Sequence, residues 1–207
     1  MPIIAAIIVS YNPDIQSIGR LTKRLLPQVS KIYIVDNSEI PVDFTQIESQ
    51  SKNIAIHKNQ ENLGIARAIN IGIKLTNTFE PDFYLLFDQD SLPSSDYVET
   101  LYRLHQKLLD EKTPVAALGG QYAATASFVE LKGLSLKRIK PHDRDYVFTD
   151  HLITSGCLIP VTAIQDIGNM KEELFIDFVD IEWCLRARSK GFFCVGSYKA
   201  KLEHKLG

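Results

Sequence analysis

Two aspartates, Asp88 and Asp90, come directly after the apolar run Phe83–Phe87. A short apolar run of this kind is typical of a buried strand, so both carboxylates are expected where the strand reaches solvent. Mg²⁺ and Mn²⁺ are typically held by one or two carboxylates together with the phosphates of a substrate. The pair therefore predicts a divalent-cation site for a diphosphate. The alternative is a strand-end turn with solvated aspartates.

A second acidic cluster, made of Asp177, Asp180 and Glu182, lies at the start of a predicted helix over Val179–Lys190. Asp177 and Asp180 are three positions apart, which places them on one face of a helix. Capping is the ordinary structural explanation, with Asp177 as the N-cap and Asp180 three positions later, where the helix dipole favours acids. The residue types leave open whether this cluster caps the helix or takes part in chemistry.

Polar residues also follow two other predicted strands. Ser10, Tyr11 and Asn12 come after the first strand, and Asp36 comes after the second. Asp36 can accept a hydrogen bond from a pyrimidine N–H, and the first loop can lie along the base. Asn, Asp and Ser are also ordinary turn residues, so each signal is weak when taken singly.

The segment 62–72 predicts a closely packed helix whose start faces an anion. Asn62 and Gly64 stand where the helix begins, and small residues follow at 66, 68 and 72. Asn70 interrupts an otherwise apolar face, so it is either a ligand contact or a core amide with a protein partner. Ser155 and Gly156, after an apolar stretch at 151–153, either contact a sugar or phosphate or form a plain turn. A G-x-G-x-x-G motif is missing, which disfavours a dinucleotide-binding oxidoreductase.

Apolar runs alternate with amphipathic stretches, which indicates an α/β domain around a mostly parallel, Rossmann-like sheet. A nucleotide-binding lobe is expected over residues 1–92 and an acceptor lobe over 93–207. Ligands gather at the carboxyl ends of strands in such sheets, so the polar residues above are expected in one site. The predicted strands are Ile3–Val9, Lys31–Val35, Ile54–Lys58, Phe83–Phe87, Val115–Leu118, Val147–Ile153 and Phe192–Val195, and the predicted helices are Asp14–Leu26, Gly64–Thr76, Tyr97–Glu111, Val161–Ile167 and Val179–Lys190.

Charge and cysteine content narrow the class of protein. A formal net charge of −2 over 207 residues gives no electrostatic reason to expect a nucleic-acid partner. The three cysteines form no C-x-x-C pair, which indicates reduced thiols in the cytoplasm. No apolar run approaches the ~20 residues that span a bilayer, so any membrane contact is expected to be peripheral. The charged segment Lys137–Asp145 is expected to be a mobile loop.

Six motifs, taken in chain order, resemble those of glycosyltransferase family 2, and in particular its bacterial rhamnosyltransferases. They are I-V-S-Y-N-P, V-D-N-S, N-x-x-N-L-G-I-A-x-A-x-N-x-G, D-Q-D, T-S-G and F-I-D-x-V-D-I-E-W-C-L-R-A, and together they span residues 3–196. The resemblance implies a GT-A fold, a nucleotide-diphosphate sugar donor and inversion at the anomeric carbon. It also implies a glycan or lipid-linked glycan acceptor at a cell surface, reached from the inner face of the membrane.

The resemblance assigns roles to individual residues. Asp36 matches the base-binding aspartate, and Asn62, Gly64 and Asn70 match the nucleotide-contacting helix start. Asp88 and Asp90 match the metal motif, in which the second aspartate is usually the direct ligand. Asp180 stands where the family keeps its catalytic base. His204 stands where relatives often place a third metal ligand, although a surface histidine is nearly as good an explanation.

Two departures qualify the match. Many members have Glu-Asp at the base, whereas this chain has Val179-Asp180, so Glu182 or Asp177 is an alternative base. Relatives commonly continue into C-terminal helices beyond the position of Gly207, so a longer protein is expected. Deoxythymidine-diphosphate-L-rhamnose is the expected donor from resemblance alone. The rival hypotheses are a nucleotide-sugar-binding domain that is not catalytically competent alone, and a nucleotidyltransferase.

Overall fold

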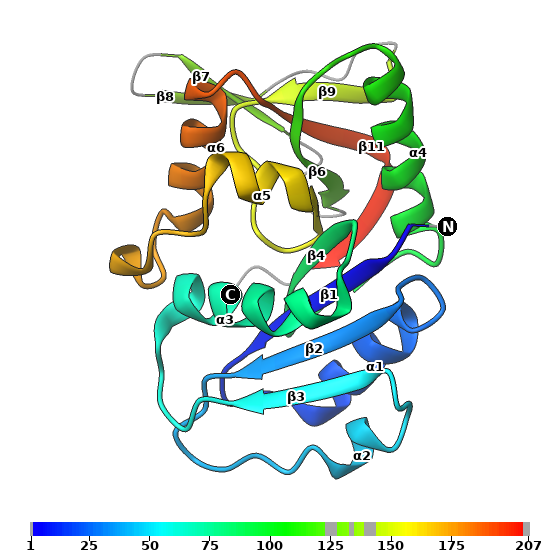
Figure 1. The fold of residues 1–207 in the computed structure, drawn as a ribbon, viewed down its shortest axis with the longest axis vertical. Coiled ribbons are helices and arrows are strands. Elements are labelled where there is room, and N and C mark those ends of the chain that lie inside the picture. The colour runs from blue at the N-terminus through cyan, green and yellow to red at the C-terminus, as the bar shows by residue number, and fades with distance from the viewer. Residues whose placement is uncertain (1, 123–127, 133–134, 139–143, 205–207) are drawn as a thin grey trace.

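The strands of the chain build one large mixed sheet and one small hairpin in the computed structural model, which describes residues 2–122, 128–132, 135–138 and 144–204. The strands are β1 (Ile4–Ser10), β2 (Lys31–Asp36), β3 (Ile54–Lys58), β4 (Phe83–Asp88), β5 (Ser91–Pro93), β6 (Val115–Tyr122), β7 (Val129–Lys132), β8 (Ser135–Arg138), β9 (Tyr146–Thr149), β10 (Cys157–Pro160) and β11 (Phe193–His204). The large sheet has the order β3-β2-β1-β4-β10-β6-β11-β5, with β9 paired to β11 (Figure 1).

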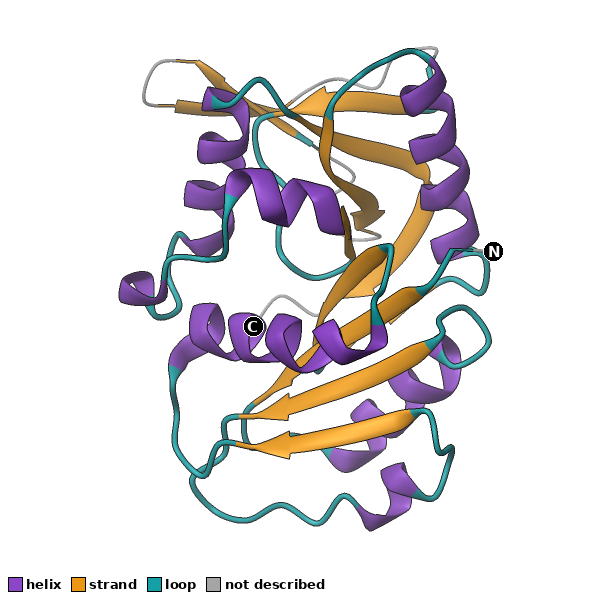
Figure 2. Cartoon of the chain, viewed as in Figure 1, coloured by secondary structure: helices purple, strands orange, loops and turns teal. Residues whose placement is uncertain are grey.

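Helices cover both faces of this sheet (Figure 2). They are α1 (Ile15–Leu25), α2 (Thr45–Glu48), α3 (Gly64–Thr76), α4 (Tyr97–Asp110), α5 (Val161–Ile167) and α6 (Val179–Ser189), with short 3-10 turns η1 (Asn77–Phe79) and η2 (Glu172–Leu174). One apolar core joins α1, α2 and α4 to the sheet, and a second joins α3, α5 and α6 to its other face.

Residues of the central strands alternate between the two cores. In β1, Ile4, Ala6 and Ile8 belong to the core with α1, whereas Ile7 and Val9 belong to the core with α3. This follows from the period of two in a strand, since successive side chains point to opposite faces of the sheet. A strand that is buried on both faces must be apolar at every position, which is why β1 and β4 read as continuous apolar runs.

The parallel part of the sheet reverses its direction of growth between β1 and β4. The chain moves outward from β1 to β2 and β3, and then returns to place β4 on the other side of β1. In an open α/β sheet, the carboxyl ends of the two strands that flank such a switch leave a crevice where ligands bind. Ser10 ends β1 and precedes Tyr11 and Asn12, and Asp88 ends β4 two positions before Asp90, so the fold brings these segments to one crevice.

Most elements agree with the sequence prediction, and α3, α5 and β3 have the predicted bounds. The second half differs most. The predicted strand over Val147–Ile153 stops at Thr149, and β5 and β10 were not predicted. Strand β10 runs antiparallel between β4 and β6, so the sheet is continuous across residue 92, where a lobe boundary was expected. Of the predicted loop Lys137–Asp145, residues 139–143 lie outside the described part, whereas Lys137 and Arg138 belong to β8.

No helix in the described part of the chain is long and apolar enough to cross a membrane.

Candidate functional site

A cavity of ≈ 320 Å³ lies at the switch between β1 and β4. Six residues predicted from the sequence line it, namely Ser10, Tyr11, Asn62, Gly64, Asp88 and Asp90, together with Val9, Asn37, Ile65, Gln89 and Ile176. These eleven residues come from five separate segments of the chain. Carboxylates, amides and hydroxyls thus face a concave space that also has an apolar wall, as is common in sites for small ligands.

The loop after β1 is tied to the loop after β2. Ser10 Oγ donates to Asp36 Oδ1 at 2.8 Å, and Ser38 Oγ donates to the same oxygen at 2.7 Å. The Asn12 N–H in turn donates to Ser38 Oγ at 2.8 Å. Asp36 is buried behind Ser10 and does not itself line the cavity. A nucleobase would therefore contact Asp36 either indirectly, by way of the Ser10 hydroxyl, or directly after the Ser10 side chain rotates away.

Gln89, the central residue of the Asp88–Asp90 motif, clamps the two loops together. Its side chain accepts from the Tyr11 N–H at 2.8 Å and donates to the Tyr11 carbonyl at 3.2 Å. One amide therefore satisfies both backbone groups of Tyr11, in the way a β-ladder partner would. The sequence analysis gave Gln89 no role, and its position between the two aspartates was the available signal.

Ser155 and Gly156 support the aspartate motif from behind and do not line the cavity. Ser155 Oγ accepts from the Asp88 N–H at 3.0 Å and lies 2.6 Å from Ser91 Oγ. The Gly156 N–H donates to the Leu86 carbonyl at 2.7 Å, at a positive φ of 82°. Both residues are buried and hold the end of β4 in place, and their contact with a ligand stays a prediction.

The start of α3 is held by hydrogen bonds to Asn62 and to Phe175. Gly64 has a φ of 79°, and its N–H donates to Asn62 Oδ1 at 3.1 Å. The Ala66 N–H donates to the Phe175 carbonyl at 3.2 Å. A Cβ on Gly64 would lie 2.6 Å from that carbonyl oxygen, so the close contact between α3 and the segment before α6 requires glycine.

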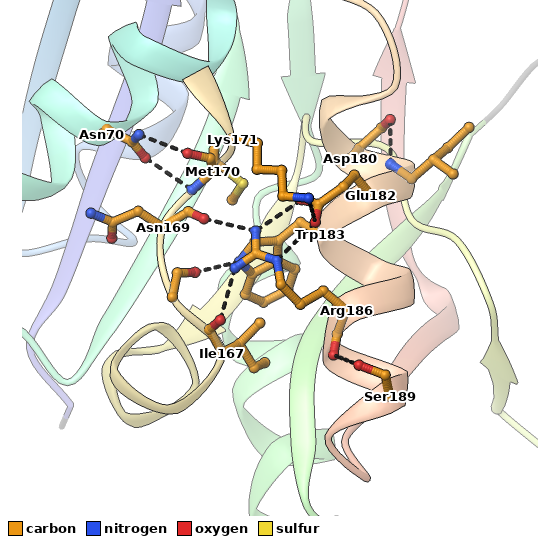
Figure 3. A network of polar contacts seen from close by, with 12 residues as sticks. Asn70, Ile167, Asn169, Met170, Lys171, Asp180, Glu182, Trp183, Arg186 and Ser189 are labelled. Atoms are coloured by element: carbon orange, nitrogen blue, oxygen red, sulfur yellow. Dashed lines mark hydrogen bonds and ion pairs between the residues drawn. The ribbon is translucent and has the colours of Figure 1, made fainter. Parts of the chain in front are cut away.

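Asn70 does not reach the cavity. Its amide donates to the Met170 carbonyl at 2.9 Å and accepts from the Met170 N–H at 3.0 Å (Figure 3). It also donates to Glu172 at 2.9 Å. Asn70 therefore has the protein partners that the alternative expects, and its contact with a nucleotide stays a prediction. Asn70 fastens α3 to the segment before η2, beside a larger open cleft of ≈ 900 Å³ between α3 and α5.

The acidic residues at the start of α6 do not have the arrangement that the capping hypothesis predicts. The N-cap is Phe178, with a left-handed φ of 63° and no side-chain capping bond, and Asp177 is exposed before it. Asp180 Oδ1 accepts from the Ile181 N–H at 2.8 Å, and Oδ2 lies 3.0 Å from His151 Nε2. Asp180 also lines a small cavity of ≈ 20 Å³ with Thr154. Asp177 is therefore not the N-cap, and Asp180 satisfies one first-turn N–H from within the helix.

The Asp180–His151 contact is a shielded ion pair. The side chains are 25% and 17% exposed, respectively. Nε2 is within hydrogen-bonding distance of Oδ2, although its N–H is not well aligned with that oxygen, and the two groups carry opposite charges when the imidazole is protonated. Burial is the largest influence on the pKa of His151 and lowers it, but contact with Asp180 and the charge of Asp180 outweigh burial. The pKa of His151 consequently lies above its usual value.

Glu182 is committed to a structural network. It accepts two hydrogen bonds from Arg186, both at 2.9 Å, and lies 3.2 Å from Lys171 Nζ. Arg186 also donates to the carbonyls of Ile167 and Asn169, each at 2.8 Å, as Figure 3 shows. The hydrogen bond from Arg186, more than the nearby Lys171, holds the pKa of Glu182 below its usual value.

The carboxylates of Asp88 and Asp90 suit a hard divalent cation, which prefers oxygen ligands. Both residues line the same cavity, which leaves room for phosphate oxygens as further ligands. Among the described residues, no group of three histidine, cysteine or acidic side chains could hold a metal alone. The backbone of His204 pairs with Ser91, next to Asp90, but the side chain of His204 lies outside the described part.

The profile of Glycosyl transferase family 2 matches residues 5–157. The dTDP-rhamnosyl transferase RfbF of Shigella flexneri is 28% identical over 211 residues, which is 99% of this chain and 69% of that protein. A crystal structure of GalNAc-T7 with UDP, GalNAc and Mn²⁺ overlays 99% of this chain with a TM-score of 0.77 at 10% identity. The chain covers only 44% of that structure. This overlay confirms the predicted GT-A fold.

Proposed function

Because the chain belongs to glycosyl transferase family 2, we propose that it binds a nucleoside-diphosphate sugar and transfers the sugar to a hydroxyl group with inversion. The observation that carries this proposal is the cavity at the switch between β1 and β4. Its lining includes Asp88 and Asp90, the Ser10–Tyr11 loop and the start of α3.

The proposed donor is deoxythymidine-diphosphate-L-rhamnose, and the similarity to a dTDP-rhamnosyl transferase supports it. The nucleoside is placed against the loop after β1, near Asp36, and the diphosphate near Asp88 and Asp90. The proposed acceptor is a cell-surface polysaccharide or a lipid-linked glycan. The protein would then act in the cytoplasm, with peripheral contact to the inner face of the membrane.

Asp88 and Asp90 are the residues that would hold a Mg²⁺ or Mn²⁺ ion, which neutralises charge on the departing diphosphate when bound. His204 stays a candidate third ligand. Asp180 is the proposed base that removes the proton from the acceptor hydroxyl. Of the three acids near α6, Asp180 is shielded and has a histidine, His151, as its basic neighbour, whereas Glu182 binds Arg186 and Asp177 is exposed.

Calorimetric titration of deoxythymidine diphosphate tests the donor and metal assignments together. Two carboxylates and a diphosphate repel one another, so binding should be strong with Mn²⁺ and weak with EDTA. Asp90→Ala should remove the metal dependence more completely than Asp88→Ala. Asp110→Ala, at the exposed end of α4, is the matched control and should bind as the parent does. Equal affinity with Mn²⁺ and with EDTA would rule out the metal role of the pair.

A further inference from the structure

We propose that His151 is a positioning residue for Asp180, which it holds toward the acceptor hydroxyl, and that proton transfer from the hydroxyl to Asp180 is faster when the imidazole is neutral. This inference rests on the proposed function, in which Asp180 is the base. His151 belongs to none of the predicted motifs.

The backbone on either side of the imidazole is fixed. Thr149 Oγ1 donates to the His151 carbonyl at 3.0 Å, at the end of β9. The following residue, Leu152, is buried, and its carbonyl accepts a long contact of 3.8 Å from Cys184 Sγ of α6. His151 is thus held between β9 and α6, with Nε2 directed at the first turn of α6, where Asp180 lies. A ring that is anchored in this way can orient a carboxylate.

Both oxygens of Asp180 have one protein contact, and both keep capacity for another. Oδ1 accepts from the Ile181 N–H, and Oδ2 faces His151. The two contacts together orient the carboxylate group. Because a carboxylate offers about four lone-pair positions, both oxygens can still accept a hydroxyl proton. Because 25% of the surface of the Asp180 side chain is exposed, an acceptor can reach it.

The charge of the imidazole affects the transfer of a proton to Asp180. In this proposal Nε2 keeps its proton toward Asp180, so the titrating proton is the one on Nδ1. A cation beside the carboxylate opposes the arrival of another proton, whereas a neutral imidazole does not. Turnover should therefore rise with pH as His151 loses its second proton. The raised pKa of His151 places this rise above the range of an ordinary histidine.

Other titratable groups near the pair must be separated from this effect. Cys184 on α6 is the other group that faces His151. Behind it lie Cys157 on β10 and Cys194 on β11. Burial raises the pKa of the Cys157 thiol, and contact with Cys184, followed by burial, raises that of Cys194. Asp150, the chain neighbour of His151, lies 2.7 Å from Arg188.

Two substitutions distinguish orientation from titration. Gln at position 151 can still donate to Asp180 but cannot titrate, and Phe fills the space of the ring without a donor. Release of deoxythymidine diphosphate from the rhamnose donor would be measured from about pH 5 to 8 with a short alkyl glycoside as acceptor probe. His151→Gln should lose the pH-dependent rise. His151→Phe should lower kcat about 10- to 100-fold at every pH, with an unchanged KM for the donor.

Cys184→Ala should keep the pH-dependent rise, and loss of the rise in this variant alone would assign it to the thiol and overturn the proposal. Wild-type kcat and pH profile in both folded His151 variants would overturn it as well. Asp180→Asn separates this inference from the proposed function. If Asp180→Asn is inactive while His151→Phe is normal, only the role of His151 is wrong. If Asp180→Asn is fully active, the base assignment itself is wrong.

Discussion

Replacing Glu182 by Gln should destabilise the fold without stopping sugar transfer. A hydrogen bond to a charged group contributes about 1.5–3 kcal/mol, and Glu182 accepts two from Arg186. Gln keeps one acceptor oxygen, and both side chains are about one-fifth exposed, at 20% and 21%. Lys171 is exposed and adds little. The expected loss is therefore about 2 kcal/mol, or roughly 4–8 °C in Tm for a domain of this size.

The pH dependence of this loss follows from the lowered pKa of Glu182. A depressed carboxyl pKa contributes stability above the unfolded value, which is 4.5, and the contribution disappears as pH falls through the folded pKa. Thermal unfolding of Glu182→Gln and the parent should consequently differ at neutral pH and converge in acid. Glu173→Gln, at an exposed neighbour, is the control. An unchanged Tm together with abolished transfer would refute this reasoning and make Glu182 the base.

Three further results are expected. Asp36→Ala should weaken binding of deoxythymidine diphosphate in calorimetry and keep its metal requirement, and a clear preference of the parent for guanosine diphosphate would contradict a pyrimidine site. Gly64→Ala should lower stability in urea by more than about 1 kcal/mol, because the new Cβ meets the Phe175 carbonyl at a positive φ. His151→Gln should have a lower free energy of unfolding than the parent below about pH 6.5, but not above the raised pKa of His151. The reason is that a raised pKa contributes stability that is lost as the pH rises. If the free energies of unfolding of the two proteins change in parallel with pH, this would argue against the ion pair.

The first half of the fold follows closely from the sequence because its signals are local. The runs that form β1 and β4 are apolar at every position, and the face of α3 has a clear helical period. The carboxyl ends of β1 and β4 are expected at the same edge of the sheet, because the two strands are parallel. Local chemistry therefore sufficed to expect Ser10, Asp88 and Asp90 near one another.

The second half was harder because its decisive contacts are not local. Strand β10 has four residues and lies antiparallel between β4 and β6. A four-residue sequence pattern does not predict where in the sheet such a strand pairs. Ser155 reads as a turn residue, and its bond to Asp88 is visible only once β10 is in place. His151 gives no sequence signal, because its role arises from α6 packing against the end of β9.

The position of β10 also has a consequence for how the protein folds. The hydrogen bond between Asp88 and Ser155 spans 67 positions, and contacts of high sequence separation form slowly because a long loop must first close. Until residues 157–160 have been synthesised and docked, one edge of β4 has no partner strand. An open strand edge invites pairing with another chain. The aspartate motif is therefore completed late in folding, on a strand that a nascent chain must keep from aggregating.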